Sequence, residues 1–236
     1  MITGVKFEIQ LVQIPEGWEA ARQFHRLKRR LPRQVRELVE DRAIETILAR
    51  AQEMLRHARQ PTKLTRVQLP ETGELNLDAT LEVPRPWQPH DIVLEQRQPR
   101  EADVVAILDM SLSMTGEKIA LTALAAAILR LRLGRLAVVC FDTRAHRLVA
   151  VGEGVTVREL IRRILRVPAQ GYTNIEAGLL KSLSELRRSQ LAERVGVIMT
   201  DGVANVGLNP VPVAARFPRL HVCLLYTSPS PRDGTK

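Results

Sequence analysis

Three oxygen-bearing side chains follow an apolar run at alternate positions: Asp109, Ser111 and Ser113 in the segment AILDMSLSM. An oxygen brought next to a core must find a partner, because burying a polar atom unpaired costs free energy. Two further residues of this kind stand later in the chain, Thr173 in QGYTN and Asp201 at the end of RVGVIMTD. Carboxylates and hydroxyls, without histidine or a usable thiol, form a hard-oxygen donor set that suits Mg²⁺.

The segments that carry these residues alternate between predicted strands and helices. Continuous apolar runs, typical of strands covered on both faces, occupy residues 103–109, 135–142 and 194–201, and a shorter strand is expected over 146–151. Helical spacing of apolar residues covers 117–133, 156–165 and 174–189. This alternation predicts an α/β fold, a doubly wound and mostly parallel sheet with helices on both sides.

In such a sheet, ligands bind at the carboxyl ends of the strands. Asp109 closes the first of these strands, Asp201 closes the last, and Thr173 lies where a loop opens a helix. We therefore expect the five oxygen-bearing residues to meet at one solvent-facing rim. There, serines can bind a cation directly while carboxylates act through water.

Residues 1–100 are expected to form an N-terminal helical and short-strand appendage. Helical spacing runs through residues 17–60, up to Pro61. The segment ELNLDATLEV, residues 74–83, alternates strictly between apolar and polar side chains, which predicts a half-buried strand. DIVLEQRQ, residues 91–98, is a candidate for another short strand.

The motifs DMSLSM, GYTNIEAGL and MTDGVAN, in this order and at these distances, resemble the metal-ion-dependent adhesion site (MIDAS) of von Willebrand factor A (VWA) domains. The family pattern is D-x-S-x-S, then a lone Thr, then an Asp after a hydrophobic strand. The resemblance covers about residues 101–222 and implies a Rossmann-like VWA fold, incomplete at its C-terminus. Bacterial members often have glycine between the two serines, where this chain has Leu112.

The resemblance also implies the roles of the site residues. It assigns direct coordination of Mg²⁺ or Mn²⁺ to the hydroxyls, and contact mostly through water to the aspartates. The metal residues implied are Asp109, Ser111, Ser113, Thr173 and Asp201. A protein partner would then supply an Asp or Glu carboxylate to the metal.

No pattern in the sequence indicates catalysis. The five histidines make no metal-spaced pair, and no G-x-S-x-G motif is present. Cys140 lies inside an apolar run and is interpreted as a packed core thiol, while Asp142, at the same rim, is interpreted as a turn residue. We expect a binding protein rather than an enzyme.

Signals for export are missing from the sequence. No apolar stretch reaches the length of a membrane span, the first residues lack a signal-peptide layout, and two cysteines make no disulfide scaffold. The chain is therefore expected to be cytoplasmic. It resembles the bacterial CoxE-like VWA proteins that act with MoxR-type AAA+ ATPases, which implies an adaptor in complex maturation or metal-cofactor insertion.

Two alternatives remain open. The formal net charge is +9, with the basic excess densest in the N-terminal third, so the Arg-rich segment 22–66 could bind nucleic acid. An aromatic content of 3% supplies base stacking poorly, which argues against this function. The second alternative is an extracellular adhesin whose export signal lies upstream of Met1.

The end of the chain differs in character from the rest. Residues 223–233 read CLLYTSPSPRD, which resembles the translation of a transposase-type sequencing-library adapter. We expect residues 223–236 to be an adapter-derived artefact and seek no functional residue among them.

Overall fold

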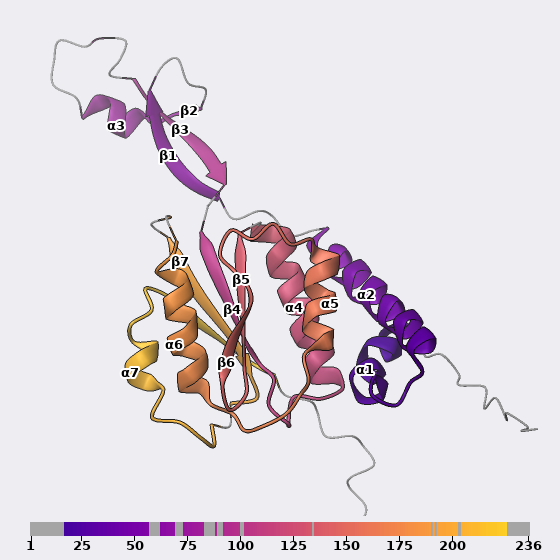
Figure 1. Ribbon diagram of the computed structural model, residues 1–236. Coiled ribbons are helices and arrows are strands. Elements are labelled where there is room, and N and C mark those ends of the chain that lie inside the picture. Colours follow the sequence, from indigo (N-terminus) through magenta and orange to yellow (C-terminus); the bar gives the residue numbers. More distant parts are fainter. Residues whose placement is uncertain are drawn as a thin grey trace, which may run out of the picture. The chain divides into compact units, whose positions relative to one another are not determined.

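The computed structural model describes the greater part of the chain. The described residues are 17–56, 62–68, 73–82, 88, 92–99, 102–133, 135–189, 191, 193–202 and 204–225. They divide into two compact units, one from Met1–Arg56 together with Asp103–Lys236 and one from His57–Ala102 (Figure 1). The first unit carries every candidate site residue.

A five-stranded sheet forms the centre of the first unit, in the order β6-β5-β4-β7-β8. The strands are β4 (Asp103–Asp109), β5 (Leu136–Phe141), β6 (Ala145–Val149), β7 (Arg194–Thr200) and β8 (Leu220–Leu224). β4 pairs in parallel with β5 and β7, β7 pairs in parallel with β8, and β6 runs antiparallel to β5. The predicted α/β fold with a mostly parallel sheet is confirmed.

Helices cover both faces of this sheet (Figure 1). They are α4 (Glu117–Leu133), α5 (Val157–Arg166), α6 (Ile175–Leu186) and the short α7 (Val211–Ala214). On the α6 side, Leu179 and Leu183 pack against the sheet residues Ile107 and Phe141 in one buried cluster. Gly178 allows this close approach, because a Cβ there would lie 2.7 Å from the Phe141 ring.

The helical segment predicted for residues 17–60 forms two helices, α1 (Gly17–Leu27) and α2 (Arg33–Leu55), which Pro32 separates. α2 packs against α4 and α5, and α1 packs against α2 and α4. The buried face of α2 consists mainly of small and branched apolar residues, namely Val39, Ala43, Ile44, Ile47 and Ala51. The two helices therefore form a further layer on the α4–α5 side of the sheet, whereas the sequence grouped them with residues 57–100.

The second unit is a small sheet of the order β1-β3-β2 with one short helix. Its elements are β1 (Thr62–Gln68), β2 (Glu74–Leu75), α3 (Leu77–Leu81) and β3 (Val93–Pro99). The prediction of a strand over 74–83 is wrong beyond Leu75, because the Asn76 side chain accepts a hydrogen bond from Ala79 N at 2.8 Å and begins a helix there. The strand expected from DIVLEQRQ is confirmed as β3, and β1 was not anticipated.

Two further expectations concern membrane-spanning helices and the C-terminal segment that begins at residue 223. None of the helices in the described part of the chain is long and apolar enough to cross a membrane. β8 includes Cys223 and Leu224, the first residues of the segment expected to be adapter-derived, whereas residues 226–236 lie outside the described ranges.

Candidate metal centre

Asp109, the last residue of β4, is held beneath the rim by two hydrogen bonds. Its Oδ1 accepts from Ser111 N at 2.9 Å, and its Oδ2 accepts from Thr200 Oγ1, at the end of β7, at 2.6 Å. The side chain is fully buried. Burial raises the pKa of Asp109 above its ordinary value, and the nearby charge of Asp201 raises it further, although the hydrogen bonds oppose this. The carboxylates of Asp109 and Asp201 thus lie near enough for their charges to repel.

The two serines lie in a turn that follows Asp109. Their Oγ atoms are 3.1 Å apart, and Met114 N donates to Ser111 O at 2.9 Å. Ser111 is buried and Ser113 is exposed. The side chains of Met110 and Met114 are both buried, which fixes the turn at each end while Leu112 points into solvent.

Thr173 reaches the same rim from the loop before α6. Gln170 N donates to Met110 O at 3.0 Å, and Leu112 N donates to Gly171 O at 3.3 Å, so this loop is bonded to the turn that carries the serines. Thr173 is buried, and its N–H donates to Asn205 Oδ1 at 2.7 Å. Asn205, which lies in the loop after β7, therefore positions Thr173.

Asp201 follows β7 and pairs with a lysine from α4. Lys118 Nζ lies 3.0 Å from Asp201 Oδ2, with side-chain exposures of 19% and 11%. The ammonium neutralises part of the negative charge that Asp109 and Asp201 bring to the rim.

Hydrogen bonds thus join the turn of Asp109, Ser111 and Ser113 to the loop of Thr173, and Asp201 lies near enough to Asp109 for their charges to repel. The expectation that the whole rim faces solvent is wrong, because Asp109, Ser111 and Thr173 are buried. Sequence reasoning missed three residues that position the others, namely Lys118, Thr200 and Asn205. Of these, only Thr200 carries a sequence signal, as a hydroxyl at the end of a buried strand.

The two neighbouring interpretations from the sequence are confirmed. Asp142 Oδ1 accepts a hydrogen bond from Arg144 N at 2.8 Å, as a turn residue does. Cys140 is fully buried, and burial raises the pKa of its thiol, so it is a core residue rather than a nucleophile.

The donor set fits a hard divalent cation. In the described ranges, no group of three or more His, Cys, Asp or Glu side chains could hold a metal ion, so a cation at this rim would need the hydroxyl oxygens. Three hydroxyls and two carboxylates supply only oxygen donors, and they leave room for water in an octahedral shell. Their roles as ligands stay a prediction.

A family model described as "VWA domain containing CoxE-like protein" matches residues 41–214. The match begins within α2 and ends within α7, so it includes all five candidate site residues. No curated protein matches the sequence.

Several solved structures are similar in fold. The vWF domain of the type V pili tip protein Mfa5 from Porphyromonas gingivalis is 24% identical, with 44% of this chain and 38% of that chain covered and a TM-score of 0.37. An aerotolerance-related membrane protein from Bacteroides fragilis is 17% identical, with 51% and 66% covered and a TM-score of 0.45. Proximal thread matrix protein 1 from the mussel byssus, with a zinc-occupied MIDAS motif, is 17% identical, with 52% and 37% covered and a TM-score of 0.43. This chain spans less than two thirds of each.

Proposed function

The chain belongs to the family of CoxE-like proteins that contain a VWA domain, and on that premise we propose that it is a metal-dependent adaptor that binds another protein rather than an enzyme. The observation that carries the proposal is the chain of bonds from Thr200 through Asp109 to Ser111, which lies 3.1 Å from the Ser113 hydroxyl. Such a network holds hydroxyl oxygens in place for a cation before the cation arrives.

The proposed metal is Mg²⁺ or Mn²⁺. Ser111, Ser113 and Thr173 would hold it directly, and Asp109 and Asp201 would hold it mostly through water. When bound, the metal supplies a concentrated positive charge that accepts a carboxylate oxygen from a partner protein. The chain's own residues orient the hydroxyls, balance the charge through Lys118 and keep Asp109 away from bulk water.

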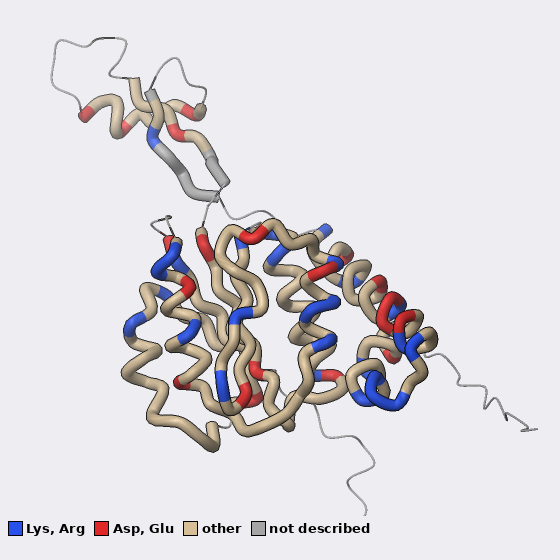
Figure 2. Tube along the Cα trace, viewed as in Figure 1, with Lys and Arg blue, Asp and Glu red and all other residues tan. Residues whose placement is uncertain are grey.

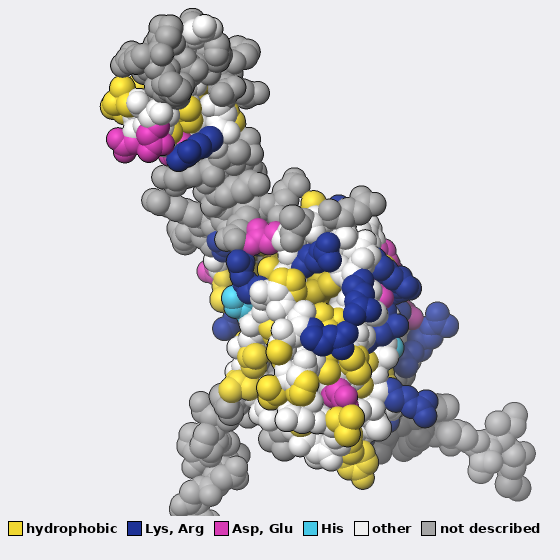
Figure 3. Space-filling model, turned by 90° about the vertical axis from the view of Figure 1, so that its left-hand side faces the viewer, with side chains coloured by type: hydrophobic (Ala, Val, Ile, Leu, Met, Phe, Trp, Pro, Cys, Tyr) yellow, Lys and Arg dark blue, Asp and Glu magenta, His cyan; other side chains and the backbone are white. Residues whose placement is uncertain are grey.

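Exposed apolar side chains beside this rim support protein binding. Leu112, between the two serines, is 67% exposed, and Tyr172, next to Thr173, is 62% exposed. Figure 3 shows hydrophobic side chains gathered toward the end of this unit at which β4 and β7 end. Apolar surface around a polar centre is typical of a protein interface.

The partner proposed is a MoxR-type AAA+ ATPase that presents an Asp or Glu, in the cytoplasm, during complex maturation or metal-cofactor insertion. Nucleic-acid binding through residues 22–66 has less support. Acidic and basic side chains are interspersed along α2 (Figure 2), and Arg22 and Arg33 pair with Glu19 and Glu37. Part of the positive charge of residues 22–66 is therefore neutralised within the protein.

The test uses a purified MoxR-type AAA+ ATPase. Binding of the purified ATPase to the immobilised chain is measured in Mg²⁺ and in EDTA, and we expect the complex only in Mg²⁺. Asp201→Asn should abolish it, whereas the matched variant Asp142→Asn, which removes a carboxylate charge from the same rim, should leave it intact. An equally tight complex in EDTA would refute metal-bridged binding.

A further inference from the structure

A basic cavity lies between the turn from α1 to α2 and the end of α5. Its volume is about 650 Å³. Five cationic side chains line it, namely Lys28, Arg29, Arg33, Arg36 and Arg166, against two carboxylates, Glu37 and Glu40. Figure 2 shows basic residues gathered where α1 turns into α2.

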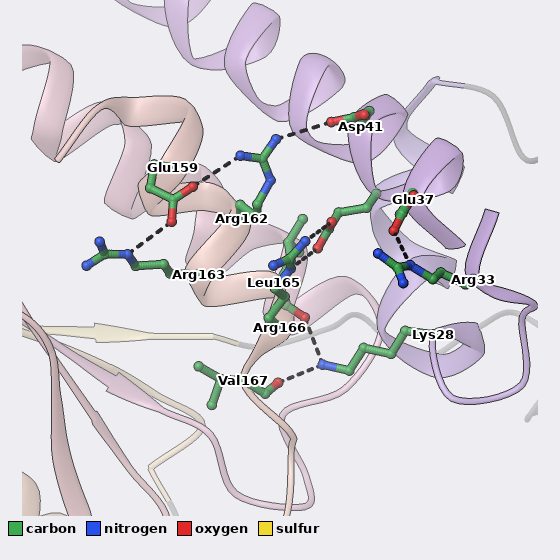
Figure 4. A network of polar contacts seen from close by, with 11 residues as sticks. Lys28, Arg33, Glu37, Asp41, Glu159, Arg162, Arg163, Leu165, Arg166 and Val167 are labelled. Atoms are coloured by element: carbon green, nitrogen blue, oxygen red, sulfur yellow. Dashed lines mark hydrogen bonds and ion pairs between the residues drawn. The ribbon is translucent and has the colours of Figure 1, made fainter. Parts of the chain in front are cut away.

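Ion pairs within the protein neutralise only part of the positive charge of this cavity (Figure 4). Arg166 binds both oxygens of Glu40 at 2.7 and 2.8 Å, and Arg33 binds Glu37 at 3.0 Å. Arg29 and Arg36 make no hydrogen bond or ion pair through their side chains with any other described residue, and both are exposed. Two guanidinium groups are thus available to an anion.

The remaining cation, Lys28, lies where its surroundings disfavour the charged form of its side chain. Lys28 Nζ donates to Leu165 O at 2.7 Å and to Val167 O at 2.8 Å, neither of which carries a charge. Burial, followed by repulsion from Arg29, lowers the pKa of Lys28 to about 8. An anion placed between Lys28 and Arg29 would relieve this repulsion.

A second hollow of about 140 Å³ extends from the cavity toward the loop that follows Ser113. It shares Lys28, Arg29 and Pro168 with the cavity and is also lined by Thr115, two residues after Ser113. A Cβ at Gly116 would lie 3.0 Å from the guanidinium of Arg26, so a further cation covers this loop. Positive side chains therefore extend from the loop of Ser113 to the cavity.

We propose that this basic surface, defined by Arg26, Lys28, Arg29 and Arg36, binds an acidic peptide segment of the protein partner. The segment would continue from the carboxylate at the metal, a step that rests on the proposed function. Single carboxylates suit the site, because each guanidinium can donate two parallel hydrogen bonds to one carboxylate, and because Glu37 and Glu40 disfavour an anion of higher charge density. The cavity's aromatic residue, Phe24, is only 1% exposed, so it offers no ring for stacking a base.

The probe is a fluorescein-labelled peptide of ten glutamates, titrated with the full chain and followed by fluorescence polarisation. Arg29→Gln combined with Arg36→Gln should weaken binding about tenfold, in Mg²⁺ and in EDTA alike. The matched control is Arg187→Gln with Arg216→Gln, two exposed arginines that follow α6 and α7, which changes the net charge equally and should weaken binding less than twofold.

The outcomes separate this proposal from the metal proposal. If Asp201→Asn and EDTA have no effect while the Arg29 and Arg36 changes do, the basic surface stands and the metal-bridged contact fails. An equal loss in the Arg187 and Arg216 control would reduce the effect to net charge and overturn the proposal. Tighter binding of a ten-nucleotide oligothymidylate, with the same dependence on Arg29 and Arg36, would also overturn it in favour of nucleic acid.

Discussion

The ammonium of Lys118, in the first turn of α4, lies 3.0 Å from Oδ2 of Asp201, at the end of β7. Both side chains are largely shielded from water, so this pair is stronger than an ion pair at the surface. A protein cation thus already occupies one side of the carboxylate that we propose as part of the metal centre. A divalent cation bound at the same rim must tolerate the charge of Lys118.

Replacing Lys118 by methionine should therefore tighten Mg²⁺ binding. The substitution keeps a similar length and removes one positive charge close to the metal, which predicts a gain in affinity of about fivefold to tenfold, measured by titration calorimetry. Lys181→Met on α6 carries the same change in net charge and should leave the affinity unaltered. A fall in affinity in Lys118→Met would instead make Lys118 necessary for positioning Asp201.

Asp109→Asn should change how the stability of the fold responds to Mg²⁺. Without metal, Asp109 is buried near Asp201 and both effects raise its pKa, so replacing the carboxyl group by an amide should not lower the free energy of unfolding. At Mg²⁺ concentrations about 100 times the dissociation constant, the wild type should gain about 2.7 kcal/mol and the variant almost nothing. Urea unfolding with and without Mg²⁺ measures both, and an equal gain in the two proteins would remove Asp109 from the metal centre.

Much of the candidate site could be predicted because its residues lie at strand ends. Asp109 and Asp201 each follow a continuous apolar run, and parallel neighbours bring such ends to one edge. Lys118 and Asn205 could not be predicted, since their roles depend on which loops become neighbours after folding. Burial of Asp109 was also missed, because a residue at the end of a strand can lie above or below the rim.

Local sequence pattern predicted some elements of the fold correctly and others wrongly. The apolar runs of β4, β5 and β7 predicted a covered parallel sheet, whereas the alternation of residues 74–83 fits a strand and was overridden by the cap at Asn76. The docking of α2 was missed as well. Glu40 looks like a solvent-facing residue in sequence, but its partner Arg166 lies 126 positions away.

The pair of Glu40 and Arg166 allows a test of whether α2 belongs to the fold of the first unit. The Glu40 side chain is 6% exposed and that of Arg166 is 62% exposed. Arg166→Ala would leave a buried carboxylate without its partner, so it should lower the free energy of unfolding by about 2 kcal/mol, a value reduced by the exposure of Arg166. Urea denaturation followed by circular dichroism measures the change.

The exposed pair of Arg158 and Glu45 joins the same two helices and supplies the matched control. Their side chains are 40% and 59% exposed, so Arg158→Ala should cost less than about 1 kcal/mol. Similar small losses in both variants would show that the ion pair of Glu40 and Arg166 contributes little to stability.

The lowered pKa of His25 predicts that the folded protein loses stability in mild acid. Its Nε2 lies 2.9 Å from Val167 O, so the neutral ring donates its proton to that carbonyl. Burial, followed by repulsion from Lys28, lowers the pKa of His25 to about 4 from 6.5. The unfolded chain therefore takes up a proton on this residue as the pH falls below 6.5, while the folded protein does not, and stability is lost between about pH 6.5 and pH 4.

The loss due to His25 alone should be about 2 kcal/mol, because the shift is large but the ring is not wholly shielded from solvent. His25→Gln isolates it, since an amide can donate to Val167 O and does not titrate. Urea unfolding at pH 7 and at pH 4.5 should show a smaller loss in the variant than in the wild type, with the titration of carboxylates common to both. Parallel losses in the two proteins would mean that His25 becomes charged in the folded state as readily as in the unfolded chain.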